Sequence, residues 1–492
     1  MDIEEFRAQA HALVDWIADY RAGIAARPVQ AQVQPGDVLA QLPAQPPAEP
    51  ESFDAVMRDL DAIIAPGLSH FQHPSFFGYF PANSLPSSVL GDFMSTGLGA
   101  LGLSWQSAPA LAELEERMAE WMRGMFGLSN LWHGAIQDTA STSTLLALLC
   151  ARERTTNFGM VRGGLQGEPH PLVVYVSKYS HSSVDKAALL AGFGRANVRV
   201  IEVDENFALR PDLLEHAITT DRAAGLVPCV VVATIGTTTT TALDPIAAVA
   251  GIAQKYGLWM HVDGALAGSA MILPECRWMW QGIEGADSIV INPHKWLGVA
   301  FDCSLFYVRD PQHLMRVMGT NPSYLQSAAD GAVKNYRDWG IPLGRRFRAL
   351  KLWTLIRTEG VAALQARLRR DMKNAQWLAE QVRIQENWRL LAPVVLQTLC
   401  VRHEPPGLQG EALDAHTKRW VDALNRSGRA YLTPATLEGR WMCRISIGAY
   451  PTEREHVAAL WETIKEISDF EFQTSDFRLK PQIWNLNLKS EI

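Results

Sequence analysis

Lys295 is the residue whose setting most favours chemistry. It lies between His294 and Trp296, a β-branched run (288–291) precedes it, and an apolar run (301–308) follows. Burial disfavours an ammonium ion and lowers its pKa, which produces a nucleophilic amine suited to Schiff-base formation. We therefore predict that Lys295 carries a carbonyl cofactor. The alternative is a solvated surface charge, the usual state of lysine.

Other polar residues follow predicted strands in the same part of the chain. His181, Asp263 and the threonine run 237–241 come directly after or at the end of such strands. Strands are expected at 171–177, 198–203, 229–236, 259–263, 288–293 and 304–309, with helices at 183–192, 211–219 and 244–256. This alternation predicts a mainly parallel sheet with helices on both faces. Ligands bind beyond the carboxyl ends of such strands, so we expect these residues to share one site, although each alone could be a cap or a core group.

A phosphate site is one of two interpretations of residues 134–154. A loop of small residues runs there into an apolar helix, so the first free N–H groups lie near Ala140 and Ser141. Free N–H groups at a helix start attract anions. An ordinary Ser/Thr cap explains the same pattern, and the sequence leaves both open.

Pyridoxal phosphate matches this set of residues. The cofactor needs a lysine for the imine, an acid at the ring nitrogen, a planar group over the ring and a helix start for the phosphate. Lys295, Asp263, His181 and the Ala140–Ser141 turn with the threonine run supply them. Zinc-protease, serine-hydrolase and P-loop motifs are missing, and Gly97, Gly99 and Gly102 form a G-x-G-x-x-G pattern after a helical rather than a strand segment. A dinucleotide site is therefore not expected.

The flanking segments predict how the site is supported. Residues 2–26 carry a helical apolar stripe, and 33–50 form an extended proline-rich strap. This arm either packs on a second subunit or folds back on its own domain. The aromatic segment 73–84 is either a core plug or a pocket wall. Further elements are a helix at 109–126, a lid-like segment at 316–340, a long helix after 344 whose Arg345, Arg346, Arg348 and Lys351 form a solvated or interface face, and strands at 390–395, 397–403 and 441–449.

Length and composition predict a soluble cytoplasmic protein of two or three domains. The chain has 492 residues, and we expect an arm at 1–85, a large α/β domain at 86–388 and a small α+β domain at 389–492. The net charge of −7 argues against nucleic-acid binding. Six widely spaced cysteines predict free thiols and no metal site, and neither a signal peptide nor a membrane segment is expected.

Several motifs together resemble the group II pyridoxal-phosphate decarboxylases, and most closely the aromatic-L-amino-acid decarboxylase branch. The similarity extends over about residues 1–470 and includes HPSFFGYFP, SHSSVDKA, HVDGALAGSA, NPHKWLGVAFDCS and IPLGRRFRALKLW. It implies the type I, aspartate-aminotransferase-like fold. It also implies a homodimer with its active sites at the subunit interface and an N-terminal arm on the neighbour.

The resemblance also implies roles for individual residues. Lys295 would form the imine, Asp263 would pair with the pyridine nitrogen, and His181 would stack on the ring. Tyr324 matches the lid tyrosine that, with His181, protonates the carbanion after carbon dioxide leaves; relatives that lack either residue make aldehydes. The implied cofactor set adds Ala140, Ser141, Thr238, Asn292 and His294, and the implied substrate pocket holds Phe80, Ala82, Leu103, Trp105 and Gly344.

Departures from the family pattern leave the substrate open. The family's usual motif HVDAAYAG is HVDGALAG in this chain, with Gly264 and Leu266, and its motif QGSAS is QDTAS, with Asp138 and Thr139. In the substrate pocket the family's threonine is Ala82 and one of its aromatic residues is Leu103. Gly264 would enlarge the space under the ring, and Asp138 would disfavour a phosphate unless it points away. We predict decarboxylation of an aromatic L-amino acid of the tryptophan, tyrosine or dihydroxyphenylalanine type. The alternatives are an aldehyde synthase, an acidic-amino-acid decarboxylase and a non-catalytic cofactor-binding regulator.

Overall fold

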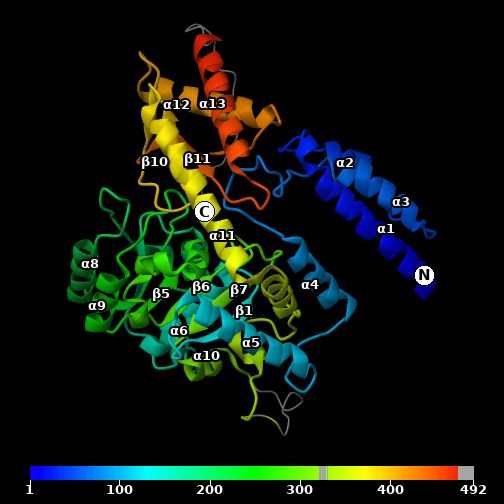
Figure 1. Cartoon of the computed structure of the whole chain (residues 1–492). Coiled ribbons are helices and arrows are strands. Elements are labelled where there is room, and N and C mark those ends of the chain that lie inside the picture. The colour runs from blue at the N-terminus through cyan, green and yellow to red at the C-terminus, as the bar shows by residue number, and fades with distance from the viewer. Residues whose placement is uncertain (321–328, 330, 475–492) are drawn as a thin grey trace.

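A computed structural model describes residues 1–320, 329 and 331–474. Two sheets form the body of the molecule, a long helix runs from one to the other, and the N-terminal helices project away from both (Figure 1).

The larger sheet is mainly parallel, as predicted. Among the described residues its seven strands follow the order β1-β7-β6-β5-β4-β2-β3, and only β7 runs antiparallel to its neighbours. The strands are β1 (His133–Gln137), β2 (Leu172–Ser177), β3 (Val198–Ile201), β4 (Val227–Thr234), β5 (Trp259–Asp263), β6 (Ser288–Ile291) and β7 (Ser304–Val308). Residues 134–137 were expected to be a loop, and that prediction is wrong. They form strand β1 because β7 offers a free edge on which Ala135 and Ile136 are buried.

Both faces of this sheet are covered by helices. Val173 and Tyr175 of β2 enter one apolar cluster, while Val174 and Val176 enter another, as the alternation of a strand requires. The surrounding helices are α5 (Pro109–Phe126), α6 (Ala140–Thr155), α7 (Ser183–Leu190), α8 (Pro211–Ala223), α9 (Ile246–Tyr256) and α10 (Pro311–Met318). Short 3-10 helices connect them: η3 (Gly159–Val161), η4 (Leu165–Gly167), η5 (Arg195–Asn197), η6 (Ala267–Ile272), η7 (Pro274–Trp280), η8 (Ile283–Gly285) and η10 (Tyr336–Trp339).

Helix α11 (Ala349–Ile384) extends from the large sheet to the small one (Figure 1). Its first half packs on α4 (Pro86–Gly97), and Gly360 interrupts it with a non-helical φ of 76°. The small antiparallel sheet has the order β10-β11-β9-β8. Its elements are β8 (Trp388–Leu390), β9 (Thr398–His403), α12 (Gly410–Arg426), β10 (Thr433–Leu437), β11 (Arg440–Ser446) and α13 (Arg454–Thr474). The strand expected at 390–395 is instead the shorter β8, and α12 and β10 were not foreseen.

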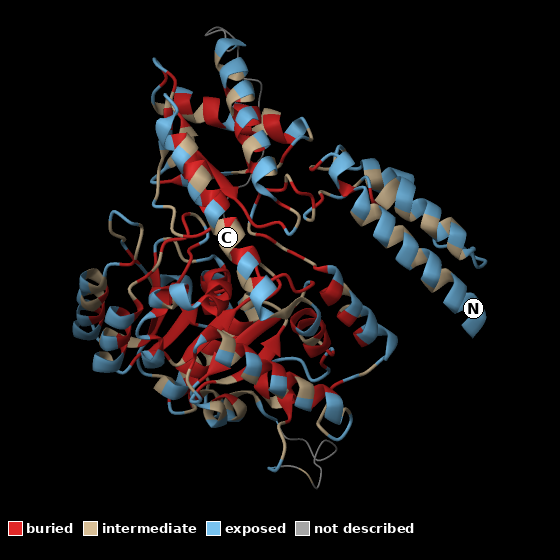
Figure 2. Ribbon diagram, viewed as in Figure 1, coloured by how far each residue is buried: buried red, intermediate tan, exposed pale blue. Residues whose placement is uncertain are grey.

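Helices α1 (Ile3–Ala22), α2 (Asp37–Gln41) and α3 (Phe53–Asp59) of the N-terminal arm project away from the rest of the chain (Figure 1), although Val29 is buried and donates its N–H to the Gly428 carbonyl. Figure 2 shows these three helices almost wholly exposed. Helix α1, which is described over its whole length, buries none of its residues, and Phe6 and Val14 are 56% and 45% exposed. The strap also differs from the prediction, because 37–41 are helical. Two short helices complete the arm: η1 (Ile24–Ala26) and the π-helix η2 (Leu60–Ile64).

Two of the four basic residues around the start of α11, Arg345 and Lys351, are buried, although the run was predicted to form a solvated or interface face. Arg345 donates two hydrogen bonds to Glu115, at 2.9 and 2.7 Å, and Lys351 is fully buried. Arg346 keeps the exposure that was predicted. The run enters the core because Glu115 of α5 supplies a buried opposite charge.

The remaining global features concern thiols, membranes and metals. All six cysteines lie in described ranges, and each is buried and unpaired. None of the described helices combines the length and apolarity needed to cross a membrane. The described residues also contain no cluster of three or more candidate metal ligands.

Candidate functional site

The turn between β6 and β7 carries Lys295 into a cavity. The two strands are antiparallel neighbours, and the Lys295 N–H donates to the Asn292 carbonyl at 3.0 Å to begin the turn. The cavity has a volume of about 200 Å³. Its lining comprises Phe80, Thr139, Ala140, Ser141, His181, Ser183, Thr234, Gly236, Thr238, Asp263, Ala265, Leu266, Asn292, His294 and Lys295.

The strand-end rule correctly brings Asp263 and His181 to this cavity. Asp263 ends β5, is 4% exposed, and accepts the Ala265 N–H at 2.9 Å. His181 lies after β2, where its Nδ1 accepts the Ser183 N–H at 3.1 Å and lies 2.8 Å from the Ser183 hydroxyl. A neutral ring in this arrangement carries its proton on Nε2. One side chain is therefore a fixed carboxylate and the other an oriented imidazole.

Burial governs the charge of the lysine. It lowers the pKa of Lys295; the carboxylate of Asp263 opposes this shift, and the positive charge of Arg444 adds to it. The Phe80 ring lies between the two cations, with its centroid 5.2 Å from the Lys295 Nζ and 4.2 Å from the Arg444 guanidinium carbon. A lowered pKa favours the free amine, which is the nucleophilic form.

The start of α6 supplies free backbone donors. The first intrahelical bond runs from the Ser143 N–H to the Thr139 carbonyl at 3.2 Å, and no described side chain caps the helix. The N–H groups of Ala140 and Ser141 are therefore left for a ligand. The observation favours the phosphate interpretation over the Ser/Thr cap.

His294 and Asn292 complete the floor of the cavity. His294 Nδ1 accepts the Cys303 N–H at 2.9 Å, and burial, reinforced by Lys295, lowers the pKa of His294 to about 3. The ring is therefore neutral. The side-chain Oδ1 of Asn292 is buried without a hydrogen-bond partner among the described residues.

Four members of the predicted substrate pocket lie away from the cavity of their own chain. Gly344 is exposed, and a Cβ placed on it would lie 3.9 Å from Leu103. Trp105 donates through Nε1 to Glu113 at 2.9 Å. Ala82 also does not line the cavity. Tyr324 lies outside the described residues.

The departures from the family pattern are placed differently from expectation. A Cβ at Gly264 would meet the Val290 carbonyl at 3.2 Å, so this glycine faces the sheet and not the cavity. Leu266 lines the cavity. Asp138 is not among the lining residues, and its carboxylate accepts the Thr139 N–H at 2.6 Å.

Sequence reasoning missed Ser183 and Arg444. Ser183 could have been found, because a serine two residues after a strand-end histidine can bond back to its ring. Arg444 has no such signal, because it belongs to β11 of the small sheet and approaches through tertiary packing.

A type I sheet with a lysine after β6 and a buried carboxylate at the end of β5 defines a pyridoxal-phosphate enzyme. The comparison with family models makes this specific, because residues 35–404 match the pyridoxal-dependent decarboxylase conserved domain. The chain belongs to this family and is an enzyme, so the non-catalytic alternative is wrong. Family membership also confirms the predicted cofactor.

Curated relatives differ in the reaction that their names state. A phenylacetaldehyde synthase of Arabidopsis thaliana is 39% identical over 480 residues, covering 96% of this chain and 97% of the relative. A tryptophan decarboxylase of Camptotheca acuminata is also 39% identical, with 95% of both chains covered. Among solved structures, Oryza sativa TDC with PLP and tryptamine matches with a TM-score of 0.93 at 35% identity, covering 96% of this chain and 99% of that one.

Proposed function

We propose that this protein decarboxylates an aromatic L-amino acid to the corresponding amine and carbon dioxide, using pyridoxal phosphate. One observation supports the proposal above all others: a single cavity joins Lys295, Asp263, His181 and the uncapped start of α6. Relatives of similar identity with decarboxylase and aldehyde-synthase names support the aromatic substrate class.

The residues present fit the cofactor. The free N–H groups of Ala140 and Ser141, with the Thr238 side chain, would hold its phosphate. The Asn292 Oδ1, which has no hydrogen-bond partner among the described residues, could accept a hydrogen bond from the bound ligand. Lys295 would hold the aldehyde, with His294 beside it. Asp263 would face the ring nitrogen, and His181 would cover the ring. When bound, the cofactor supplies the electron sink that carbon dioxide loss requires.

The protein's residues prepare this chemistry by placing charge. The Asp263 carboxylate accepts a hydrogen bond from the Ala265 N–H and would keep the ring nitrogen of the cofactor protonated. Lys295 is kept nucleophilic by burial. His181 lines the cavity with Nδ1 occupied by Ser183, so Nε2–H is the ring group that would deliver a proton to the substrate carbon. Tyr324 would share that step, as the family resemblance implies.

A second subunit would complete the substrate pocket. Leu103, Trp105 and Gly344 lie away from the cavity of their own chain, and the arm exposes apolar residues such as Phe6 and Val14. Exposed apolar surface of this kind typically marks an association site. We propose a homodimer in which each chain supplies these residues to the other's site, with the protein located in the cytoplasm.

The aldehyde synthase is the second candidate, because relatives with that name are as similar as the decarboxylases. The pair His181 and Tyr324 favours amine formation. An acidic-amino-acid decarboxylase is less favoured, since the names of relatives at 36–39% identity refer to aromatic compounds.

A substrate panel tests the proposal. Purified protein is incubated with tryptophan, tyrosine, dihydroxyphenylalanine, phenylalanine and glutamate, while carbon dioxide, amine, aldehyde and hydrogen peroxide are measured. We expect amine and carbon dioxide from an aromatic substrate, and no visible imine band in Lys295→Ala. Aldehyde with peroxide would establish the synthase instead, and an imine band that survives in Lys295→Ala would refute the assignment of this lysine.

A further inference from the structure

The residue that follows Lys295 is held from behind by α11. Trp296 is completely buried, and its indole Nε1–H donates to Asp371 Oδ2 at 2.9 Å. The Trp296 carbonyl accepts a hydrogen bond from Arg367 at 2.6 Å. Both the ring and the backbone of Trp296 are therefore tied to one turn of α11, and the backbone tie is one residue from the lysine.

The same aspartate is connected to the small-sheet part of the molecule. Its other oxygen, Oδ1, accepts two hydrogen bonds from Arg370, both at 3.2 Å. Arg370 also donates to Glu453 at 2.6 Å and to the Tyr450 carbonyl at 3.0 Å. Tyr450 and Glu453 lie between β11 and α13, so a continuous chain of hydrogen bonds runs from the Lys295 turn to that segment.

A second connection reaches the same segment. The Asn83 side-chain amide donates to the Gly448 carbonyl at 2.7 Å and lies 3.5 Å from the Lys295 carbonyl. Its oxygen accepts the Tyr450 N–H at 2.7 Å. The peptide that carries Lys295 is thus braced on two sides against one short segment.

We propose that Asp371 is a positioning residue that fixes the Lys295 turn relative to the small-sheet part of the protein. This inference rests on the proposed function, since it concerns a lysine that bonds the cofactor. Asp371 is fully buried and accepts hydrogen bonds from the Trp296 indole and the Arg370 guanidinium. Hydrogen bonds to a carboxylate are charge-assisted and therefore stronger than those between neutral groups. A displacement of about 1 Å in a catalytic group can lower a rate about a hundredfold.

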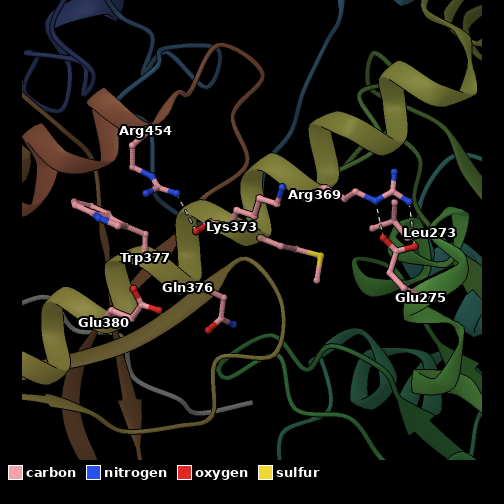
Figure 3. A pocket seen from close by; sticks show the side chains of 9 residues that line it. Leu273, Glu275, Arg369, Lys373, Gln376, Trp377, Glu380 and Arg454 are labelled. Atoms are coloured by element: carbon pink, nitrogen blue, oxygen red, sulfur yellow. Dashed lines mark hydrogen bonds and ion pairs between the residues drawn. The ribbon is translucent and has the colours of Figure 1, made fainter.

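The neighbouring residue on α11 provides a matched control. Arg369 pairs with Glu275 at 2.6 and 3.0 Å in the pocket shown in Figure 3. Arg369 and Arg370 are adjacent arginines on one helix, and each pairs with a glutamate of another segment. Only Arg370 touches Asp371, so the two differ in their link to the lysine.

The experiment compares holoenzyme variants by the pH midpoint of the imine's visible absorbance, by kcat and KM, and by melting temperature. The variants are Asp371→Asn, Arg370→Met, Trp296→Phe and the control Arg369→Met. We expect the first three to move the midpoint by about half a pH unit and to lower kcat about tenfold, with KM changed less than about twofold. Arg369→Met should match the wild type in all but melting temperature. The double variant Trp296→Phe/Arg370→Met should shift the midpoint no further than the larger single shift.

A purely structural role would give a different result. If Asp371→Asn and Arg370→Met lower the melting temperature but leave the imine midpoint and kcat unchanged, the inference is wrong. If Asp371→Asn does not fold, Arg370→Met decides, because its side chain is a quarter exposed. Failure of the proposed function is distinct, because the wild type itself would then give no amine from any aromatic substrate, whatever the variants do.

Discussion

Burial and the Asp263 carboxylate act on the charge of Lys295 in opposite directions. Burial favours the neutral amine, while the carboxylate favours the ammonium form. The positive charge of Arg444, which lies over the Phe80 ring, adds to the effect of burial. A group of the small sheet therefore adjusts the reactivity of a lysine on the large one.

Buried charge also stabilises the protein outside the cavity. Glu115 is 1% exposed and holds both Arg345 and the Ile136 N–H. We expect Glu115→Ala to lower the free energy of unfolding by about 3–5 kcal/mol, because it leaves a buried guanidinium unpaired. Arg346→Ala, which breaks an exposed pair with Asp92, should cost less than about 1 kcal/mol. Urea unfolding followed by tryptophan fluorescence measures both values, and equal values would contradict the argument.

At the scale of elements, α4 and α11 approach closely where α4 has no side chain. A Cβ on Gly91 would lie 2.6 Å from the Leu350 carbonyl and 2.8 Å from the Lys351 Cα. The Thr354 hydroxyl also lies against this position, but a rotation of that side chain would leave the two backbone contacts, so relief requires the helices to separate. This close packing holds the first half of α11 against α4.

Gly91→Ala should therefore destabilise the protein by about 1–3 kcal/mol through overpacking. Gly97→Ala is the control, because it lies in the same helix with nothing within 4 Å of the added Cβ. That change should leave stability unaltered or raise it by up to about 1 kcal/mol. Melting temperatures of both variants test this pair, and a stable Gly91→Ala would show that the helices can shift at little cost.

The sequence predicted the elements whose patterns are local. The strand ends at Asp263 and Lys295 and the start of α6 were predicted correctly, because alternation along the chain determines where a parallel sheet places its carboxyl ends. Strand β1 was missed because its glycine and polar residues resemble a loop until β7 supplies a partner. The burial of Arg345 was missed because it depends on Glu115, which is 230 positions away.

At the scale of the whole molecule, the proposed homodimer would use both the arm and the predicted substrate pocket. The predicted divisions after residues 85 and 388 stay predictions, and α11 extends close to the second one. Helix α1 buries none of its residues in its own chain, so burial of its apolar residues would require a partner.

Val14→Glu should weaken the dimer, since a charge on exposed apolar surface of α1 opposes its burial. We expect the dimer dissociation constant to rise about tenfold or more, and activity to fall at concentrations where monomer accumulates. Val161→Glu, at an 87% exposed position near η3, is the control. Sedimentation velocity with parallel assays measures both, and full activity of a Val14→Glu monomer would contradict a shared site.

The six buried cysteines give the protein its own reporters of local opening. Burial raises the pKa of the Cys276 thiol to about 11 and of the Cys229 and Cys400 thiols to about 12. In the closed state an alkylating reagent therefore cannot reach these sulfur atoms, and the thiols are not in the reactive thiolate form. Cys400 and Cys443 lie in the small sheet, and the other four lie in the larger α/β part. Pulse labelling with iodoacetamide, followed by peptide mass spectrometry, therefore measures the rate of local opening of each part separately, without any introduced probe.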